Sequence, residues 1–363
     1  MRDGLTRRDW LATAALAGIA LPHGTEAAAM GQRARLSLNE NPFGPSPLVR
    51  QAILDQMQAL PRYVVDEARA LEQQIAMKEG VSPDQIILGE ILDVLGLQLA
   101  LRGPAGGEFL YSEPGYTALV DAVAPGGGVA VGIPLNAKLE NDLPAFAARI
   151  GPRTRALYLV NPHNPSGTVS ETTSFKRFLR DASRRAIVIV DEAYLEFEPD
   201  FVDRTAVSLV RDGLDVIVFR TFAKIYGLAG LAIGYAIAPA GLATELKRKG
   251  LGEPHGLNRL ALAAASASLR DRAYLATVRA KVIAERTLWH GLLDRLKRPR
   301  SDSRGNFVFF DTGRPHDAFA VAMAAEGIDI ARAFPPLDTW ARISIGLPAE
   351  NARAHAAVRK IFE

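Results

Sequence analysis

The sequence predicts an α/β protein with a mostly parallel β-sheet. Short runs of β-branched and other apolar residues alternate along the chain with helical patterns, which is the order of right-handed βαβ units. Several of these runs are apolar throughout, as expected for strands that are buried on both faces of a parallel sheet. Hydrophobic residues make up 48% and charged residues 23% of the 363 residues, a globular composition in a chain long enough to bury a large core.

The elements follow one another in a simple order. We expect the strands of the main sheet at residues 85–88, 108–111, 156–160, 186–190 and 216–219. Helical patterns lie between them, for example over residues 116–123 and 172–183. A long stretch rich in Ala and Leu, about residues 257–296, is expected to form helix and to join the sheet to a smaller C-terminal α+β unit. That unit would hold strands at residues 306–310 and 342–345.

The length predicts two domains after an N-terminal segment. Residues 55–265 are expected to form the larger sheet domain, with helices on both faces. Residues 30–54 together with residues 266–363 are expected to form the smaller domain. Residues 1–29 are assigned to an export signal, so the mature chain would hold only the two domains.

The first thirty residues have the order of a cleavable export signal. Arg7 and Arg8 precede an apolar run of eleven residues, 11–21, and small residues follow at 27–29. The run is too short for a membrane span, which needs about 20 helical residues. Paired arginines before an aromatic residue resemble a twin-arginine signal, so we expect a periplasmic protein that is exported folded and cleaved after Ala27 or Ala29. The alternative, an amphipathic first helix of the mature protein, is disfavoured because the run has no polar face.

Charge and composition exclude several classes of protein. A net charge of +3 is too small and too dispersed to indicate a nucleic-acid partner. The chain has no cysteine, which excludes a disulfide scaffold, a thiol nucleophile and a Cys-ligated metal. The six histidines have no metal-ligand spacing, so no metal site is expected.

Polar residues gather where three of the predicted strands end. Asn164 follows the third strand, Asp191 and Tyr194 follow the fourth, and Thr221 and Lys224 follow the fifth. Ligand sites of such sheets form beyond the carboxyl ends of the strands, so we expect these side chains to lie together. A lysine can form a Schiff base with a carbonyl compound. A carboxylate that pairs with a pyridinium nitrogen is what pyridoxal phosphate needs to act as an electron sink.

Each of these residues also has a purely structural interpretation. Lys224, in a loop rich in Gly and Ala, could be a solvated surface lysine, and Asp191 could cap a helix. The Asn-Pro-Ser-Gly run from Asn164 is typical of a turn, and Tyr194 could be a packing residue. The residues favour a common site because they occur together in this order, with 27 residues from Asn164 to Asp191 and 33 from Asp191 to Lys224.

Together with residues 36–46, 62–63, 113–116, 305–307 and 342–346, these motifs resemble the fold-type-I pyridoxal-phosphate enzymes of the class I/II aminotransferases, most closely the histidinol-phosphate aminotransferase group. The resemblance covers almost all of residues 35–362. It implies a seven-stranded sheet domain between helices. It also implies pyridoxal-phosphate-dependent transfer of an amino group from an amino acid to a 2-oxo acid. A homodimer with its site at the subunit interface is the implied assembly.

The resemblance assigns cofactor roles to matching residues. Lys224 would carry the Schiff base and move the proton of the reaction, and Asp191 would pair with the pyridine nitrogen. Asn164 and Tyr194 would hydrogen-bond the phenolic oxygen of the ring, and Tyr116 would stack on its face.

Other matching residues would bind the substrate or the phosphate. Arg342 would hold the substrate carboxylate, because a planar guanidinium binds a carboxylate bidentately. Asn39 would lie near the substrate entrance. Arg332 falls near the position of the family's second arginine in the C-terminal domain, but residues 331–336 differ from the family, so the size of the substrate stays open. Tyr63 would reach the phosphate of the cofactor in the neighbouring subunit.

The phosphate-binding part departs from the family at three places. A Gly-Ser-rich turn usually holds the phosphate at a helix N-terminus, but residues 88–93 read Leu-Gly-Glu-Ile-Leu-Asp, about three residues short and without the serine. Ala223 replaces the serine before the lysine, and Ala232 replaces an arginine. Thr221 and Tyr63 remain as possible phosphate contacts, and Gly89 and Glu90 in the shortened turn stay candidate cofactor-binding residues.

Two interpretations of these departures stay open. The pocket either still binds pyridoxal phosphate, held by other groups or less tightly, or has been retuned to another ligand, and we favour the first. For the reaction we favour transamination by an exported enzyme. Histidinol phosphate is disfavoured as its substrate because histidine biosynthesis is cytoplasmic. The alternatives are another reaction of the same cofactor (decarboxylase, C–S lyase, epimerase or oxidase) and a non-catalytic binding protein with a degraded phosphate cradle. The amino donor and acceptor stay open.

Overall fold

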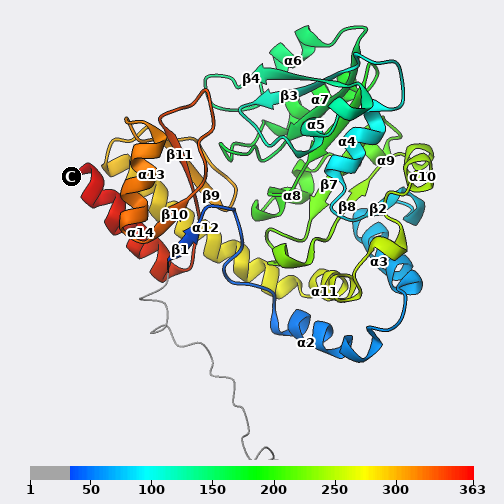
Figure 1. Ribbon diagram of the computed structural model, residues 1–363, viewed down its shortest axis with the longest axis horizontal. Helices are drawn as coiled ribbons and strands as arrows, with labels where there is room; N and C mark the ends of the chain where they lie inside the picture. Colours follow the sequence, from blue (N-terminus) through cyan, green and yellow to red (C-terminus); the bar gives the residue numbers. More distant parts are fainter. Residues whose placement is uncertain (1–32) are drawn as a thin grey trace, which may run out of the picture. The chain divides into compact units, whose positions relative to one another are not determined.

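The computed structural model of the protein describes residues 33–363 (Figure 1). The export signal predicted in residues 1–29 lies outside the described residues. Residues Ala34–Glu363 form one compact unit. The expected boundaries at residues 54/55 and 265/266 therefore stay a prediction. Among the described residues, no helix combines the length and the apolar character needed to cross a bilayer.

The central sheet has seven strands and is mostly parallel, which confirms the predicted fold class. Its spatial order is β2-β8-β7-β6-β5-β3-β4. Only β8 runs antiparallel to both of its neighbours, β2 and β7. The strands span β2 (Ile86–Leu88), β3 (Glu108–Glu113), β4 (Val129–Pro134), β5 (Thr154–Val160), β6 (Ile187–Asp191), β7 (Val216–Thr221) and β8 (Gly234–Ile237).

Five of these strands coincide with predicted ones, whereas β4 and β8 were not predicted. β4 lies at the edge of the sheet, contains Gly132 and exposes most of its residues, so it lacks the apolar pattern of a buried strand. β8 has only four residues and follows the polar loop after β7. β8 pairs with β2, which is distant in sequence, and with β7, which a loop separates from it. These contacts, and not a local pattern, make this segment a strand.

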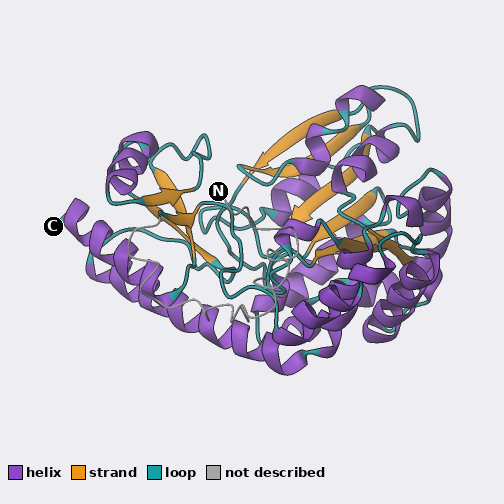
Figure 2. Ribbon diagram, turned by 60° about the horizontal axis from the view of Figure 1, so that its bottom comes forward, coloured by secondary structure: helices purple, strands orange, loops and turns teal. Residues whose placement is uncertain are grey.

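Helices cover both faces of the sheet (Figure 2). The alternation along β5 shows the two layers: Leu157 and Leu159 pack into the larger core, whereas Ala156, Tyr158 and Val160 pack beneath α4, α5 and α10. The helices span α2 (Pro47–Asp55), α3 (Val65–Glu79), α4 (Leu92–Ala100), α5 (Ala118–Asp121), α6 (Leu143–Arg149), α7 (Thr172–Ala182), α8 (Phe201–Arg204), α9 (Val207–Arg211), α10 (Ala240–Arg248), α11 (Arg259–Arg270), α12 (Arg272–Arg295), α13 (His316–Ala325) and α14 (Pro348–Phe362).

Two helical predictions need correction. The stretch 257–296 is not one helix, because the chain breaks at Asp271, whose side chain accepts a hydrogen bond from the Tyr274 N–H and caps α12. The helix expected over residues 116–123 is reduced to the single turn of α5, and a 3₁₀ turn begins directly after it at Ala124.

The C-terminal part mixes helices with two small sheets, and of their four strands only the two expected at residues 306–310 and 342–345 were predicted. β9 (Phe307–Asp311) pairs antiparallel with β11 (Trp340–Ser344). β10 (Ile328–Ile330) pairs parallel with β1 (Ala34–Leu36), so the start of the described chain is tied to its C-terminal part. This pairing carries residues 37–44 past the ends of the central strands.

Candidate functional site

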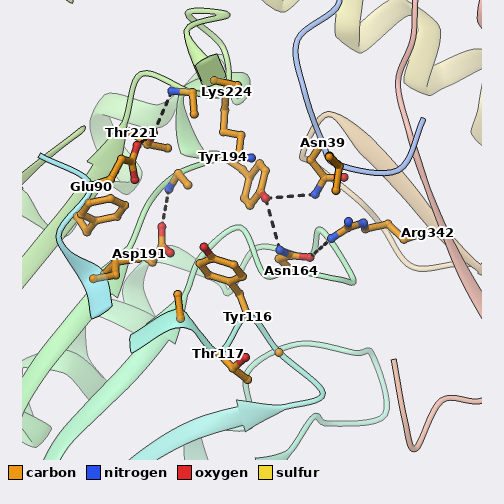
Figure 3. A pocket seen from close by; sticks show the side chains of 18 of the residues that line it. Asn39, Glu90, Tyr116, Thr117, Asn164, Asp191, Tyr194, Thr221, Lys224 and Arg342 are labelled. Carbon is orange, nitrogen blue, oxygen red and sulfur yellow. Dashed lines mark hydrogen bonds between the residues drawn. The ribbon is translucent and has the colours of Figure 1, made fainter. Parts of the chain in front are cut away.

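The carboxyl ends of β5, β6 and β7 open into a cavity of about 570 Å³. Ten of the twelve residues that the sequence singled out line it: Asn39, Glu90, Tyr116, Asn164, Asp191, Tyr194, Thr221, Lys224, Arg332 and Arg342. They come from segments more than 300 residues apart, and most of them point toward one space (Figure 3).

Lys224 is presented by the loop after β7. The Ala223 N–H donates to Thr221 Oγ1 at 2.9 Å, and the Gly227 N–H donates to the Lys224 carbonyl, also at 2.9 Å. Gly227 has a φ of +72°, and a β-carbon there would lie 2.6 Å from the Gly44 backbone. Only glycine therefore fits, and its small size lets the loop lie against the segment before α2. The Lys224 Nζ lies 5.7 Å from the centre of the Tyr194 ring.

Asp191 ends β6 with its side chain buried. Its Oδ2 accepts a hydrogen bond from the Tyr158 hydroxyl at 2.8 Å, and its Oδ1 accepts one from the Ala193 N–H at 3.0 Å. Burial raises the pKa of Asp191 to about 6, although these hydrogen bonds favour the charged form. Asp191 is not the cap of a helix, so the structural interpretation of this residue is wrong.

Two amides aim at the phenol of Tyr194. Asn39 donates to the Tyr194 oxygen at 3.2 Å and Asn164 donates to it at 3.4 Å (Figure 3). The hydroxyl hydrogen is therefore left to donate to an acceptor in the cavity. Asn39 has a φ of +54° and is held by Ser344, whose hydroxyl accepts from the Asn39 N–H at 2.8 Å. Asparagine tolerates this left-handed conformation better than most residues.

Arg342 comes from β11 and is buried. It donates to the Asn164 side-chain oxygen and, at 2.9 Å, to the Ser37 carbonyl. Its Nε has no hydrogen-bond partner within residues 33–363. Burial lowers the pKa of Arg342 to about 10. A buried guanidinium with an unused donor is a site for an anionic acceptor such as a carboxylate.

Phe334 lies at the same end of the cavity as Arg342. Arg342 lies 5.0 Å from the centre of its ring and Arg332 lies 4.7 Å from it. Arg332 is exposed and donates to the neighbouring Ala333 carbonyl at 2.8 Å. Both arginines thus lie at one end of the cavity.

Glu90 and Thr221 lie at the other end, away from Arg342 (Figure 3). The Thr221 hydroxyl donates a short hydrogen bond to Glu90 Oε1. Loss of hydration against the cavity wall raises the pKa of Glu90, while the bond to Thr221 and the charge of Lys224 oppose the rise. Ala223 and Ala232 also line the cavity, in agreement with the departures seen in the sequence.

Gly89 and Tyr63 are not among the described residues that line the cavity. The Gly89 N–H donates to the Gly234 carbonyl at 2.8 Å, so it extends the pairing of β2 with β8 and is not free for a ligand. The Tyr63 side chain is exposed, and its ring packs edge-on against His255 with the centroids 5.1 Å apart. Its role toward a second subunit stays a prediction.

Two residues of the site region, Tyr158 and Phe334, were not predicted from the sequence. Tyr158 is a lone tyrosine in an otherwise aliphatic part of β5, beside the strand that carries Asp191, and this contrast was the available signal. Phe334 lies in a loop that brings it beside Phe309 of β9, with ring centroids 6.0 Å apart, and no local pattern indicated this placement.

The two ends of the cavity differ in how well they fit pyridoxal phosphate. The ring end fits, because a buried carboxylate, an amine and a phenol with two amide donors surround one space. The end formed by Glu90, Thr221 and Ala232 does not fit a phosphate group, because it presents a carboxylate where cationic and N–H donors would be needed.

Comparisons with known proteins show the family of the chain. The aminotransferase class I and II family model matches residues 33–358. An aromatic amino acid aminotransferase of Cutibacterium acnes is 35% identical over 341 residues, which are 93% of this chain and 95% of that protein. A solved histidinol-phosphate aminotransferase from Sinorhizobium meliloti, in complex with pyridoxal-5'-phosphate, is 31% identical with a TM-score of 0.82, covering 91% of each chain. A putative histidinol-phosphate aminotransferase from Erwinia carotovora atroseptica is 28% identical, with a TM-score of 0.83, and covers 90% of this chain and 95% of that one.

Proposed function

The chain belongs to the class I and II aminotransferase family, and we propose that it transfers the amino group of an aromatic amino acid to a 2-oxo acid outside the cytoplasm. Pyridoxal-phosphate-dependent transamination is the activity that the family and its relatives indicate for this chain. The cofactor supplies the electron sink of that reaction when it is bound. The roles of the individual residues, the amino donor and the location are proposals.

One observation carries the assignment of the site. A single cavity holds a buried carboxylate, Asp191, a lysine, Lys224, and a buried guanidinium with an unused donor, Arg342. Asp191 would hold the proton of a pyridine nitrogen, Lys224 would provide the amine and later move a proton, and Arg342 would orient the substrate carboxylate. These three tasks together are the minimum for amino transfer on a pyridine cofactor.

The donor is proposed from the walls around Arg342. Leu38 and Phe334 present apolar surface to the cavity, which suits an aromatic side chain. The aromatic amino acid aminotransferase of Cutibacterium acnes supports the same class of donor.

Other features of the chain support the proposed periplasmic location and the proposed homodimer. The arginine pair, apolar run and small residues of positions 1–29 support export to the periplasm by the twin-arginine route. Exposed apolar side chains along α2 and the loop after it (Leu48, Leu54, Met57, Leu60 and Tyr63) support a homodimer that would cover them. Light scattering of the purified protein would test the dimer, and replacement of Arg7 and Arg8 by lysine should stop export.

The proposed reaction is tested with the purified mature protein. Added pyridoxal phosphate should give a visible absorption band that is lost in Lys224→Ala. Phenylalanine, tyrosine or tryptophan should bleach this band, and a 2-oxo acid should restore it. A protein that stays colourless with pyridoxal phosphate and with pyridoxal would refute the assignment. A band that forms, but that no amino acid bleaches reversibly, would refute transamination alone.

A further inference from the structure

The end of the cavity next to β7 and β8 presents acceptors to a ligand. The Thr221 hydroxyl uses its hydrogen on Glu90, and its oxygen already accepts from the Ala223 N–H at 2.9 Å. A β-carbon at Gly234, the first residue of β8, would lie 3.2 Å from Glu90 Oε1, so the carboxylate is close to the start of that strand. The Thr221 hydroxyl therefore has no hydrogen left to donate to a phosphate oxygen.

No arginine compensates for Glu90 among the cavity-lining residues that the structure describes at this end. The cavity's two arginines, Arg332 and Arg342, both lie over Phe334 at the opposite end. Lys224 lowers the pKa of Glu90 by its charge, but its amine is the group proposed to react with the cofactor. Tyr63, which the family resemblance would bring from a second subunit, would offer a hydroxyl donor but no guanidinium or ammonium cation.

The helix that follows Glu90 offers only a weakened anion site. The N-terminus of α4 carries no side-chain cap from Ile91, but the carboxylate of Asp93 accepts the Val94 N–H at 2.8 Å. One N–H of the first turn is thus already used by an acid. The negative charge of Asp93 also raises the pKa of Glu90, so a second acid adds to the negative potential around the Glu90 carboxylate.

We propose that this cavity prefers a pyridoxal ring with a free 5'-hydroxymethyl group to its phosphate ester, with Glu90 accepting the hydrogen bond of that hydroxyl. The inference rests on the proposed function, because it concerns the same cavity and the same Lys224. A hydroxyl can donate to a carboxylate, whereas a phosphate dianion beside it is repelled. The phosphate ester would then bind weakly and exchange with the phosphate-free form.

The test compares ligands that differ only at the 5' position. Pyridoxamine and pyridoxamine 5'-phosphate are titrated into the cofactor-free mature protein, and binding is followed by the fluorescence of the ligand. Neither ligand has an aldehyde, so imine formation does not affect the comparison. We expect wild-type protein to bind pyridoxamine at least as tightly as its phosphate. In Glu90→Gln the Kd for the phosphate should fall about tenfold or more, because a like charge is removed, and the Kd for pyridoxamine should change less than about threefold.

Asp121→Asn is the matched control, since Asp121 is another carboxylate that lines the cavity but is bound to Thr117, at 2.7 Å. It should leave the ratio of the two dissociation constants unchanged. Ala232→Arg adds a cation without altering Glu90 and should shift the preference toward the phosphate. This variant still tests the inference if Glu90→Gln does not fold. Tighter binding of the phosphate by wild type, or an equal effect of Glu90→Gln on both ligands, would overturn the inference.

The two proposals fail differently. If pyridoxal and its phosphate both give the Lys224-dependent band but the phosphate forms bind more tightly, only the preference is wrong. If neither form binds, the proposed function and the preference both fall.

Discussion

The hydroxyl of Tyr158 donates a 2.8 Å hydrogen bond to Oδ2 of Asp191, and both side chains are buried. Tyr158 belongs to β5 and Asp191 to β6, which are neighbouring parallel strands, so the register of the sheet sets this pair. Tyr158 does not line the cavity and acts through Asp191 as a positioning residue.

Replacing Tyr158 by phenylalanine should destabilise the cofactor-free protein more at pH 8 than at pH 5. Asp191 is charged at pH 8, because its pKa is about 6, and a buried carboxylate that loses a donor costs about 1–3 kcal/mol. Urea unfolding at the two pH values measures the difference. Tyr111→Phe is the control, because the Tyr111 hydroxyl bonds Glu113 at 3.1 Å on the exposed side of β3. An equal loss at both pH values would contradict the assigned role.

Asp191→Asn should stabilise the empty protein at pH 8 while it weakens binding of the cofactor ring. The pKa of Asp191 is raised from 3.8 to about 6 by burial, so the folded state holds its proton more tightly than the unfolded state. Its contribution to stability is full below pH 4 and is lost as the pH rises through 6. The asparagine avoids this loss, which is at most about 3 kcal/mol. Melting temperatures from pH 4 to 8 should therefore diverge with rising pH, and parallel curves would contradict the prediction.

Arg342→Gln should lower kcat/KM for the amino donor by at least about a hundredfold and leave the Lys224-dependent band in place. Losing a bidentate contact with the substrate carboxylate removes two charged hydrogen bonds, each worth about 1.5–3 kcal/mol. Arg332→Gln is the comparison, because Arg332 is exposed at the same end, and its effect should stay below about tenfold. Similar losses in the two variants would show that Arg342 is not the carboxylate clamp.

Arg220→Met should destabilise the protein by about 3–5 kcal/mol without a direct effect on the cavity. Arg220 is buried on β7 next to Thr221 and does not line the cavity; it bonds Glu79 at 2.8 Å and Glu192 at 2.9 Å. Removing the cation takes this partner from two buried carboxylates, and within residues 33–363 only Glu79 of the two keeps an ion pair, with Lys78 at 3.3 Å. Urea unfolding measures the loss. Arg102→Met breaks the more exposed pair with Glu245, 3.0 Å apart, and should cost less than about 1 kcal/mol.

The sequence was sufficient to predict five of the seven central strands and ten of the residues that line the cavity. Asn164, Asp191 and Lys224 directly follow apolar strands, and parallel strands bring their carboxyl ends to one edge, so their meeting follows from the order of elements alone. The departures at Ala223, Ala232 and the short turn before α4 could also be seen without coordinates.

Only the tertiary structure shows which residue the Glu90 carboxylate contacts. Its partner Thr221 is 131 residues away, and nothing near either residue in the chain indicates a bond between them. The same holds for Arg342 and Asn164, which are 178 residues apart and meet because β1 and the segment after it tie the C-terminal unit to the strand ends. Sequence patterns report the local preference of the backbone and the burial of a face, whereas contacts between distant side chains depend on how the packed elements are finally placed.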